Sequence, residues 1–385
     1  MLMKHKGGLQ GCDVIIVYPD RALAESKLAP SLSRALHARI CVTNSIRDVE
    51  ANYKPLVYPV IVFSASIGKR FAIMGYAKPL ANKYYVLNPY LSARLALSSG
   101  IKPIYTHHSR VVIEYYGKFK QLLNNLNMSL LTKALSLILL SNVDEVKVTF
   151  TSNTSQPLPY IIVYTDLNLT NMVRSVKRVG SAYLISDARS ISQLLSSIEN
   201  RGIPYIVRFK PASKDYLMAF GPLKAPIKVY VYIDLECPYS AKYFTTVLPK
   251  LLMEAKKGVI RLVVKSMIVH SDPELPLMHD AIACYATSEG SMKAFNLTLK
   301  IFHLVLEGKK PTLALLSNFT GLNATLLASK CHGLAEESTN EARQLHIPGT
   351  PSTVVYYSKD HISAVLVGVV PFRDVEQLIR LGVGS

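Results

Sequence analysis

The stretch from Glu236 to Ser240, ECPYS, decides how the C-terminal part of this chain is expected to fold. It follows an apolar run from Lys228 to Asp234 (KVYVYID), which is typical of a buried strand, and it opens a helix predicted from Ser240 to Glu254. Cys237 would then lie at the helix N-terminus, where free backbone N–H groups stabilise a thiolate. Because the thiolate is the reactive form of cysteine, this placement predicts a nucleophile.

The fourth position of this motif is Ser240 where a second cysteine would complete a C-x-x-C pair. In thiol–disulfide exchange a thiolate attacks a disulfide and forms a mixed disulfide. A second cysteine would resolve that intermediate, whereas a serine cannot. The Ser240 hydroxyl is expected to hydrogen-bond the Cys237 thiolate instead. The motif therefore predicts nucleophilic attack without a built-in release step.

One pattern of strands and helices occurs three times along the chain. An apolar run ending at an aspartate is followed by a helical stretch, and later a proline opens another apolar strand. A further strand is then expected to end at a glycine. The aspartates are Asp20, Asp166 and Asp234, the prolines are Pro59, Pro204 and Pro351, and the glycines are Gly75, Gly221 and Gly368. Such a repeat predicts three α/β modules, each beginning with a right-handed βαβ unit.

The spacing of these landmarks sets the expected boundaries. The modules are predicted at residues 1–80, 151–225 and 226–385, with a mostly helical segment at 81–150 between the first two, in which 111–116 and 145–150 are candidates for extra strands. The last module has a much longer interval between its aspartate and its proline, which predicts a helical insertion at 270–345. Within the second module, helices are expected at 169–179 and 190–200 and strands at 160–164 and 182–186.

Residues 226–385 resemble the DsbA-like branch of the thioredoxin superfamily. The resemblance rests on the ECPYS motif after a strand, the helical insertion, Gly349-Thr350-Pro351 before the next strand, and Gly368 before a final helix. It implies an α/β thioredoxin-like fold in which Cys237 is the attacking thiol and Pro351 is a cis-proline beside that sulfur. It also implies that the backbone near Pro351 pairs with a substrate peptide as an added strand. Substrate contacts are expected at Pro238, Tyr239, Thr350 and Pro351.

The two earlier modules resemble degenerate thioredoxin-type folds. Where the last module has its cysteine, they read Asp20 to Ala24 and Asp166 to Thr170, without a thiol. Both are therefore expected to be redox-inactive, and to act as a scaffold, a dimerisation surface or a substrate-binding arm.

Four further cysteines accompany Cys237. Relatives of the DsbA type imply a structural disulfide between Cys284 and Cys331 in the insertion; two free buried thiols are the alternative, and a resolving role for either is a third. Cys12 and Cys41 lie near adjacent predicted strands. Burial as free thiols in the core is the default expectation for that pair, and a bond between them is the alternative.

The composition narrows the kinds of partner. The chain carries 44 Lys and Arg against 26 Asp and Glu, and most of the excess lies in residues 1–225, but the cations are scattered and match no RNA-binding motif. The most apolar stretch, Leu130 to Leu140, is too short for a bilayer, which needs about 20 apolar residues. We therefore expect neither a nucleic-acid nor a membrane partner, and we predict a cytoplasmic protein, because no apolar leader segment is recognisable.

No cofactor or metal site is predicted. Walker and Rossmann glycine patterns do not occur, and His107-His108 has no Cys, Asp or Glu at ligand spacing. His270, His279 and His332 are interpreted as ordinary surface or insertion residues. Glu236 is interpreted as a solvated carboxylate, with a role in raising the pKa of the neighbouring thiol or in moving its proton as the alternative.

The predicted function is a thiol–disulfide oxidoreductase that acts through Cys237 alone, with Ser240 beside it. It would be a monothiol reductase or an isomerase on protein disulfides. Its partners would be thiol- or disulfide-containing proteins, together with a separate reductase or a small thiol that releases the intermediate. The alternative is a non-enzymatic thioredoxin-fold scaffold or binding protein. The sequence does not fix an oligomeric state.

Overall fold

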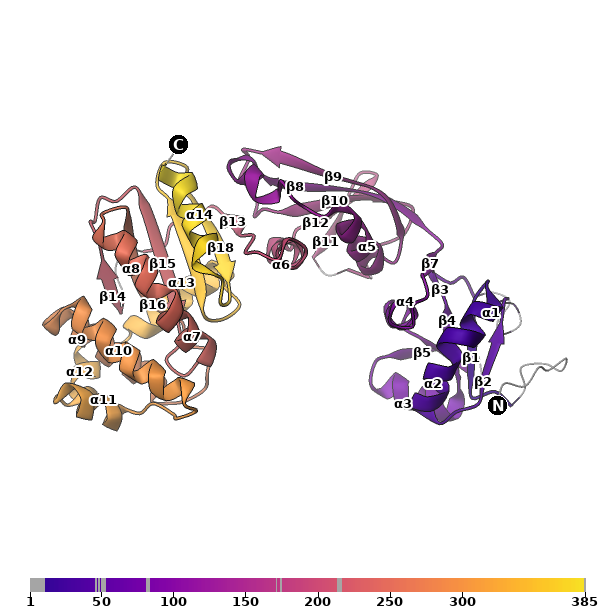
Figure 1. Cartoon of the computed structure of the whole chain (residues 1–385), viewed down its shortest axis with the longest axis horizontal. Coiled ribbons are helices and arrows are strands. Elements are labelled where there is room, and N and C mark those ends of the chain that lie inside the picture. The colour runs from indigo at the N-terminus through magenta and orange to yellow at the C-terminus, as the bar shows by residue number, and fades with distance from the viewer. Residues whose placement is uncertain are drawn as a thin grey trace. The chain divides into compact units, whose positions relative to one another are not determined.

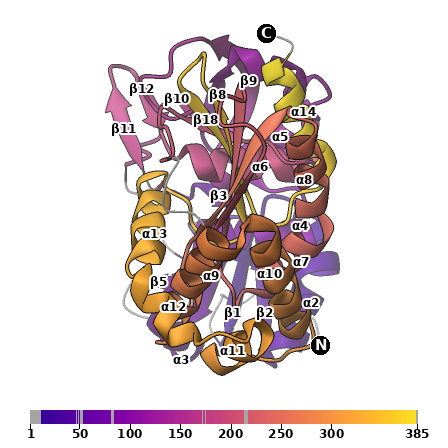
Figure 2. The ribbon, with the colours of Figure 1, turned by 90° about the vertical axis from the view of Figure 1, so that its left-hand side faces the viewer.

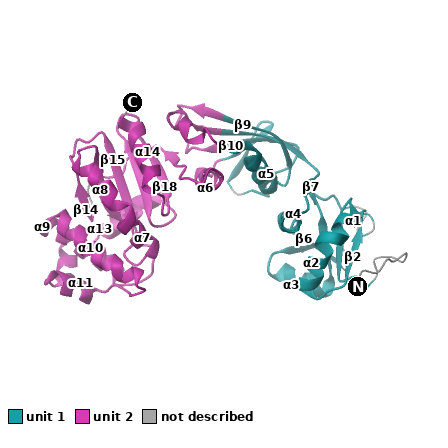
Figure 3. Cartoon of the chain, viewed as in Figure 1, with its two compact units in different colours: residues 1–113, 127–148, 161–185 teal, residues 114–126, 149–160, 186–385 magenta. Residues whose placement is uncertain are grey.

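A computed structural model describes residues 11–383 except 46, 48, 50–52, 81–83, 171, 174 and 213–216. The chain forms two compact units, each built from segments that are discontinuous in the sequence (Figures 1 and 3). Unit 1 comprises residues 1–113, 127–148 and 161–185. Unit 2 comprises residues 114–126, 149–160 and 186–385.

The first sheet has the strand order β2-β1-β4-β6-β5. Strand β1 pairs with β2 in parallel and with β4 in antiparallel orientation, and the Tyr58–Pro59 bond before β4 is cis. The strands are β1 Val14–Val17, β2 Ile40–Thr43, β4 Val60–Ser64, β5 Ala77–Pro79 and β6 Tyr84–Leu87, and a small pair is formed by β3 Val57–Tyr58 and β7 Ile104–Tyr105. The helices are α1 Arg21–Leu23, a π-helical turn Ala24–Leu28, α2 Ala29–Leu36, α3 Ala65–Ile73 and α4 Pro89–Ser98.

Two predictions for this region are wrong. The strand expected to end at Gly75 is helix α3, in which Ile67 and Phe71 recur at helical spacing and pack against the core. The segment 81–150 is not mostly helical, because it contains the long strands β8 His108–Tyr116 and β9 Asn142–Thr151 beside α5 Met128–Leu139 and the 3-10 turn Gly117–Leu123. Burial alternates along β8, as expected for a half-buried strand.

The second sheet differs from a thioredoxin arrangement. Its order is β11-β12-β10-β8-β9, and β10 Tyr160–Thr165 pairs with β12 Ala182–Ile185 in antiparallel orientation, where a βαβ unit requires parallel strands. The helix predicted at 169–179 is wrong, because Val176–Val179 forms β11 in a hairpin with β12 that turns at Gly180. The second degenerate thioredoxin module is therefore not present in this form, although α6 Ala188–Glu199 forms as expected.

The third sheet belongs to unit 2 and has the order β13-β18-β17-β15-β16-β14. Strand β15 pairs with β16 in parallel and with β17 in antiparallel orientation, and the Thr350–Pro351 bond before β17 is cis. The strands are β13 Tyr205–Val207, β14 Met218–Phe220, β15 Ile227–Ile233, β16 Ile260–Ser266, β17 Ser352–Tyr357 and β18 Ile362–Val367.

Helices cover this sheet and fill the expected insertion. α7 Pro238–Thr246 and α8 Leu248–Lys256 follow β15, and α14 Phe372–Val383 closes the chain. Between β16 and β17 come α9 Leu275–Glu289, α10 Ser291–Leu306, α11 Leu313–Thr320, α12 Ala324–Lys330 and α13 Leu334–Gln344 (Figure 2). The single helix predicted from 240 to 254 is interrupted at Val247, since Pro249 cannot donate the hydrogen bond that a continuous helix needs. The expected start at residue 226 is too late, because β13 and β14 join this sheet.

A buried ion pair ties α13 to the sheet. Lys265 Nζ lies 2.6 Å from Glu341 Oε1, and the Tyr232 hydroxyl donates to the same oxygen. Lys265 also donates to the carbonyl oxygen of Ala212 at 3.2 Å. Each charge in this otherwise apolar layer therefore has a partner, as buried charges require.

Four of the five cysteines form disulfides. Cys12 is bonded to Cys41 and Cys284 to Cys331, with Cα–Cα distances of 5.9 and 5.6 Å. The default expectation of free, core-packed thiols at Cys12 and Cys41 is wrong, because the residues just before β1 place Cys12 within disulfide reach of Cys41 in β2. Cys237 is the one free cysteine of the chain.

Among the described helices, none by itself meets the length and hydropathy that a bilayer span requires. Gly117–Leu123 and Met128–Leu139 meet this requirement only when taken together, and the chain bends sharply between them.

Candidate functional site

Cys237 is held between the end of β15 and the start of α7. It is the N-cap residue of α7, and Pro238 occupies the first helical turn, where its missing N–H costs nothing. The Cys237 side chain makes no capping hydrogen bond to the helix, and only 5% of the residue is exposed. Its Sγ donates to the carbonyl oxygen of Thr350 at 3.4 Å. The sulfur therefore lies at a helix N-terminus and against the cis peptide segment, as the resemblance implied.

The segment around Pro351 is fixed by its own hydrogen bonds. The Ser352 hydroxyl donates to the carbonyl oxygen of Gly349 at 2.7 Å. The carbonyl oxygen of Pro351 accepts from the Gly368 N–H at 2.8 Å. Thr350 Oγ1 is buried without a hydrogen-bond partner among the described residues. The backbone of this segment is therefore held in place, and the hydroxyl of Thr350 lies near Cys237 without a hydrogen-bond partner among the described residues.

Ser240 has a different role from the one expected. It is fully buried, and its Oγ accepts from the Asp234 N–H at 3.3 Å. The hydrogen bonds of the described residues include none between Ser240 and Cys237. Ser240 therefore stabilises the turn that leads from β15 into α7, and the hydroxyl–sulfur contact is not present in this structure.

The carboxylate of Asp234 also stabilises this turn. Its buried carboxylate accepts from the backbone N–H of Glu236 at 2.8 Å and of Val269 at 2.8 Å. The N–H of His270 lies at 3.2 Å, and Nδ1 of the His270 ring at 3.1 Å from the same carboxylate. A carboxylate with this many donors is well compensated for its burial, so it fixes the active-site turn to the loop that follows β16.

His279 supports the turn from helix α9. Its Nε2 accepts from the Leu235 N–H at 3.2 Å, and its Nδ1 lies 2.9 Å from Ser266 Oγ. Complete burial lowers the pKa of His279 to about 4, partly opposed by the charge of Asp234. The ring is therefore neutral near pH 7, and because Nε2 accepts, Nδ1 must carry the proton and donate to Ser266. The interpretation of His279 as an ordinary insertion residue is wrong.

Glu236, next to the cysteine, is also not a solvated side chain. Its carboxylate is largely buried and lies beside Asp272, and Lys310 Nζ is 3.7 Å from Glu236 Oε1 and in contact with Asp272. Burial, with the proximity of Asp272, raises the pKa of Glu236. Hydrogen bonding to Lys310 lowers the pKa of Asp272 to about 2. Of this pair, Glu236 is the carboxyl that holds a proton more readily.

Tyr239, two residues after Cys237, is 66% exposed. Cys284 and Cys331 are bonded to each other, so neither is a free resolving thiol in this state. His332 is mostly exposed, with Nδ1 3.8 Å from Asp280 Oδ2.

The histidine pair His107-His108 does have acidic neighbours, contrary to expectation. Nδ1 of His107 lies 3.1 Å from Asp166, and Nδ1 of His108 lies 3.0 Å from Asp144. These partners come from segments far along the chain, so the local sequence could not reveal them. Among the described residues there is no cluster of three or more His, Cys, Asp or Glu side chains able to hold a metal ion.

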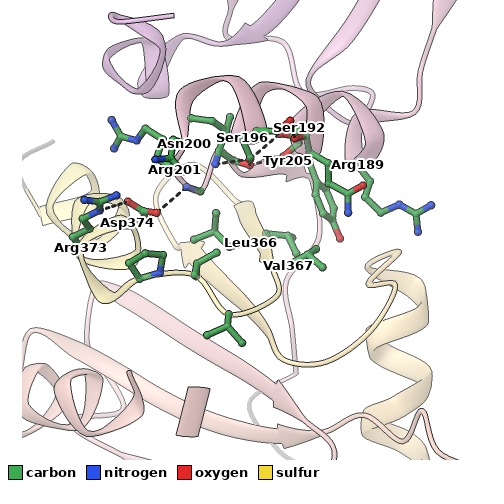
Figure 4. A pocket seen from close by; sticks show the side chains of 18 residues that line it. Arg189, Ser192, Ser196, Asn200, Arg201, Tyr205, Leu366, Val367, Arg373 and Asp374 are labelled. Carbon is green, nitrogen blue, oxygen red and sulfur yellow. Dashed lines mark hydrogen bonds and ion pairs between the residues drawn. The ribbon is translucent and has the colours of Figure 1, made fainter. Parts of the chain in front are cut away.

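A cavity of about 450 Å³ lies between α6 and the segment that joins β18 to α14 (Figure 4). Val367 lines it, and the Asp374 carboxylate closes one end by accepting from the Gly202 N–H at 2.7 Å. Gly368, directly after Val367, is the residue whose N–H binds the carbonyl oxygen of Pro351. A lining residue of the cavity is therefore next in the chain to the residue that hydrogen-bonds the cis-proline segment.

Residues 213–359 match the sequence model of a family described as thioredoxin. This region is a thioredoxin domain. The thioredoxin match and the helical insertion between β16 and β17 confirm the prediction of a C-terminal DsbA-like domain, and the α/β class is confirmed with it.

Several solved structures are similar to a part of the chain. Oxidised BdbD from Bacillus subtilis is 16% identical, with a TM-score of 0.38 over 46% of this chain and 97% of that protein. Wolbachia pipientis α-DsbA1 is 18% identical, with a TM-score of 0.37 over 45% and 93%. The catalytic domain of Proteus mirabilis ScsC is 17% identical, with a TM-score of 0.35 over 44% and 89%. A search of curated proteins found no match.

Proposed function

We propose that the thioredoxin domain is a thiol–disulfide oxidoreductase that acts through the single nucleophile Cys237. The observation that carries the proposal is the Cys237 sulfur at the N-terminus of α7, against the carbonyl oxygen of Thr350, with no other free cysteine in the chain. Because the cysteine side chain does not cap the helix, the N–H groups of the first turn are open to a thiolate.

The first step is the same for every substrate of this kind. The Cys237 thiolate attacks one sulfur of a protein disulfide, a bond forms between that sulfur and Cys237, and the other substrate sulfur leaves as a thiolate. No electrons are gained or lost overall, since one disulfide replaces another. Pro238, Tyr239, Thr350 and Pro351 are the residues proposed to contact the substrate.

Release requires a thiolate from outside this site. If a second thiolate of the substrate attacks the mixed disulfide, Cys237 is regenerated and the substrate is isomerised. If a small thiol attacks it, the substrate leaves with that half reduced and a second equivalent of the small thiol completes a two-electron reduction. A protein reductase would serve in the same way as the small thiol.

A direct test uses a scrambled-disulfide protein as substrate with the reduced full chain, with and without glutathione. We expect a covalent complex on non-reducing gels in the absence of glutathione and regain of native pairing in its presence. Cys237→Ser is the matched control and should lose both. Equal activity of Cys237→Ser, or no covalent complex while both proteins bind the unfolded substrate equally, would support the non-enzymatic binding function instead.

Cytoplasmic location remains a prediction. Disulfides persist mainly in oxidising compartments, or in the cytosol of heat-adapted organisms. Because the chain has two bonded pairs, Cys12–Cys41 and Cys284–Cys331, a cytoplasmic location would require a heat-adapted organism.

A further inference from the structure

One long segment of unit 1 carries positive charges alone. Residues 51–113 contain no aspartate or glutamate, although the whole chain has 26 acidic residues. Over the same stretch the cations are Lys54, Lys69, Arg70, Lys78, Lys83, Arg94, Lys102 and Arg110. Helices α3 and α4 belong wholly to this segment, so their cations have no acidic neighbours within it.

An apolar cavity of about 410 Å³ opens among the helices of this region. Its floor is formed by Phe63 of β4 and Leu87 of β6, and its walls come from α2, α3 and α4. Phe71 of α3 stacks on Phe63 with ring centroids 4.8 Å apart. Leu91 and Leu95 of α4 form the opposite wall. Side chains that leave such a gap instead of closing it are arranged to enclose another apolar group.

The lining of the cavity combines a cation with a half-exposed tyrosine. Arg94 lines the cavity, and its guanidinium lies 5.8 Å from the centre of the Tyr90 ring. No carboxylate among the described residues pairs with Arg94. Tyr76 also lines the cavity and is half-exposed. The lining thus places a cation and an aromatic ring beside the apolar interior.

We propose that this cavity binds the acyl chain of a single fatty-acid-like carboxylate, whose head group pairs with Arg94. A volume of about 410 Å³ falls in the range of roughly 300–1,000 Å³ typical of small-molecule sites. The arginine fork suits a carboxylate, and the absence of acidic residues from 51 to 113 favours anions over cations.

A peptide is a poorer occupant for a structural reason. A bound peptide needs partners for its backbone N–H and C=O groups. The cavity is lined almost entirely by apolar side chains, and the edge strands β2 and β5 of the sheet do not contribute to its lining. An acyl chain carries no such groups, so it enters without leaving a polar atom unpaired.

The test titrates the full chain with dodecanoate below its micellar concentration, using calorimetry. We expect saturable binding at one site. Arg94→Gln should weaken it at least tenfold, because a charge-assisted pair is lost. Ala35→Trp should also weaken it at least tenfold by filling the cavity from an exposed position of α2. Arg34→Gln is the matched control, since Arg34 is exposed on the same helix and does not line the cavity, and it should leave binding unchanged.

Three results would overturn the proposal. Dodecyltrimethylammonium binding as tightly as dodecanoate would show that charge plays no part. Unchanged affinity of Arg94→Gln and Ala35→Trp, with native circular dichroism, would place the ligand elsewhere. Binding to phosphatidylglycerol vesicles without binding of free dodecanoate would make the region a membrane-contact surface.

Discussion

The first sheet and the sheet of the thioredoxin domain share an order of four strands, but different residues cap the helices that follow their first strands. In the order β2-β1-β4-β6 and in the order β16-β15-β17-β18, a parallel pair is followed by two antiparallel strands, with a cis proline before the third. In the first, Asp20 is the N-cap and its carboxylate accepts from the Leu23 N–H at 3.0 Å. In the second, the N-cap is Cys237, whose side chain makes no such bond.

The cap residue, and not the strand order, distinguishes the reactive region from the unreactive one. Both regions offer a helix N-terminus after a buried strand, so the shared strand order does not distinguish a reactive site from an inert one. In the first region, the carboxylate of Asp20 accepts a hydrogen bond from the Leu23 N–H, so this N–H group is not available to another anion. In the second region the N–H groups remain open for a negative sulfur. Variants of either region alone test this comparison.

The largest effect is expected for Ser240→Cys, which adds the second thiol that the thioredoxin domain lacks. A cysteine three residues after Cys237 would attack the mixed disulfide from within, so the covalent substrate complex should accumulate at least tenfold less than in the unmodified chain. Non-reducing electrophoresis after acid quenching measures this accumulation. Undiminished accumulation would mean that the bond from Ser240 Oγ to the Asp234 N–H is needed to keep the turn in place.

The next largest effect is expected at the buried ion pair between Lys265 and Glu341 of the thioredoxin domain. Glu341→Gln leaves Lys265 charged and buried, and should lower the free energy of unfolding of the thioredoxin domain by about 3–5 kcal/mol. Urea denaturation with pulse proteolysis follows this domain. The double variant Lys265→Met/Glu341→Leu is the control, and should recover most of the loss because no unpaired charge remains. A double variant as unstable as the single one would show that packing around Tyr232 matters more than charge.

A third prediction uses pH to separate the two regions. The unfolded chain takes up a proton on His279 near pH 6.5, whereas burial holds its pKa in the folded domain near 4. The unfolded state therefore binds more protons across that window, and His279 should reduce the stability of the thioredoxin domain by about 3 kcal/mol as the pH falls from 6.5 to 4.

Denaturation midpoints between pH 4 and pH 7.5 measure this dependence. His279→Gln, which can still accept from the Leu235 N–H, should flatten the profile by that amount. His332→Gln, at an exposed position, should leave the profile as it is. Equal profiles for both variants would contradict the assignment of His279 as a neutral buried support.

The smallest effect is expected in the first region, at the N-cap of α1. Asp20→Ala removes the cap of α1 and should cost the first region about 1 kcal/mol of stability, while Asp20→Asn should cost little. Neither variant should alter the reaction of Cys237. Hydrogen exchange of peptides from residues 21–36 reports the loss locally. A change in the rate of Cys237 modification would show that the two caps are coupled.

The sequence predicted those parts of the molecule whose interactions are local. The run from Lys228 to Asp234 and the ECPYS motif located a strand, a turn and a helix N-terminus, because periodicity and cap chemistry are properties of neighbouring residues. The helical insertion was equally visible in its spacing. The same local pattern misled in the second repeat, where Val176–Val179 forms a hairpin with its successor instead of a helix.

The support of the site was not predictable in the same way. Asp234, His270 and His279 meet under the turn from three different elements, and Glu236 meets Lys310 from a loop more than 70 residues away. Burial of Glu236 depends on that loop, so its neighbours in the sequence gave no sign of it. The Cys12–Cys41 bond likewise depends on the path of the chain just before β1, which the composition of the two strands does not specify.

The division of the five cysteines has a consequence for any reductant that recycles the protein. Such a molecule meets three sulfur–sulfur bonds during turnover, of which only the one to substrate is to be broken. Burial does not separate these bonds, because Cys237 is as buried as Cys12 and Cys284. What separates them is the leaving group: the thiolate of Cys237 leaves at a helix N-terminus, so a suitable reductant breaks the bond to substrate faster than the two bonds that hold the fold.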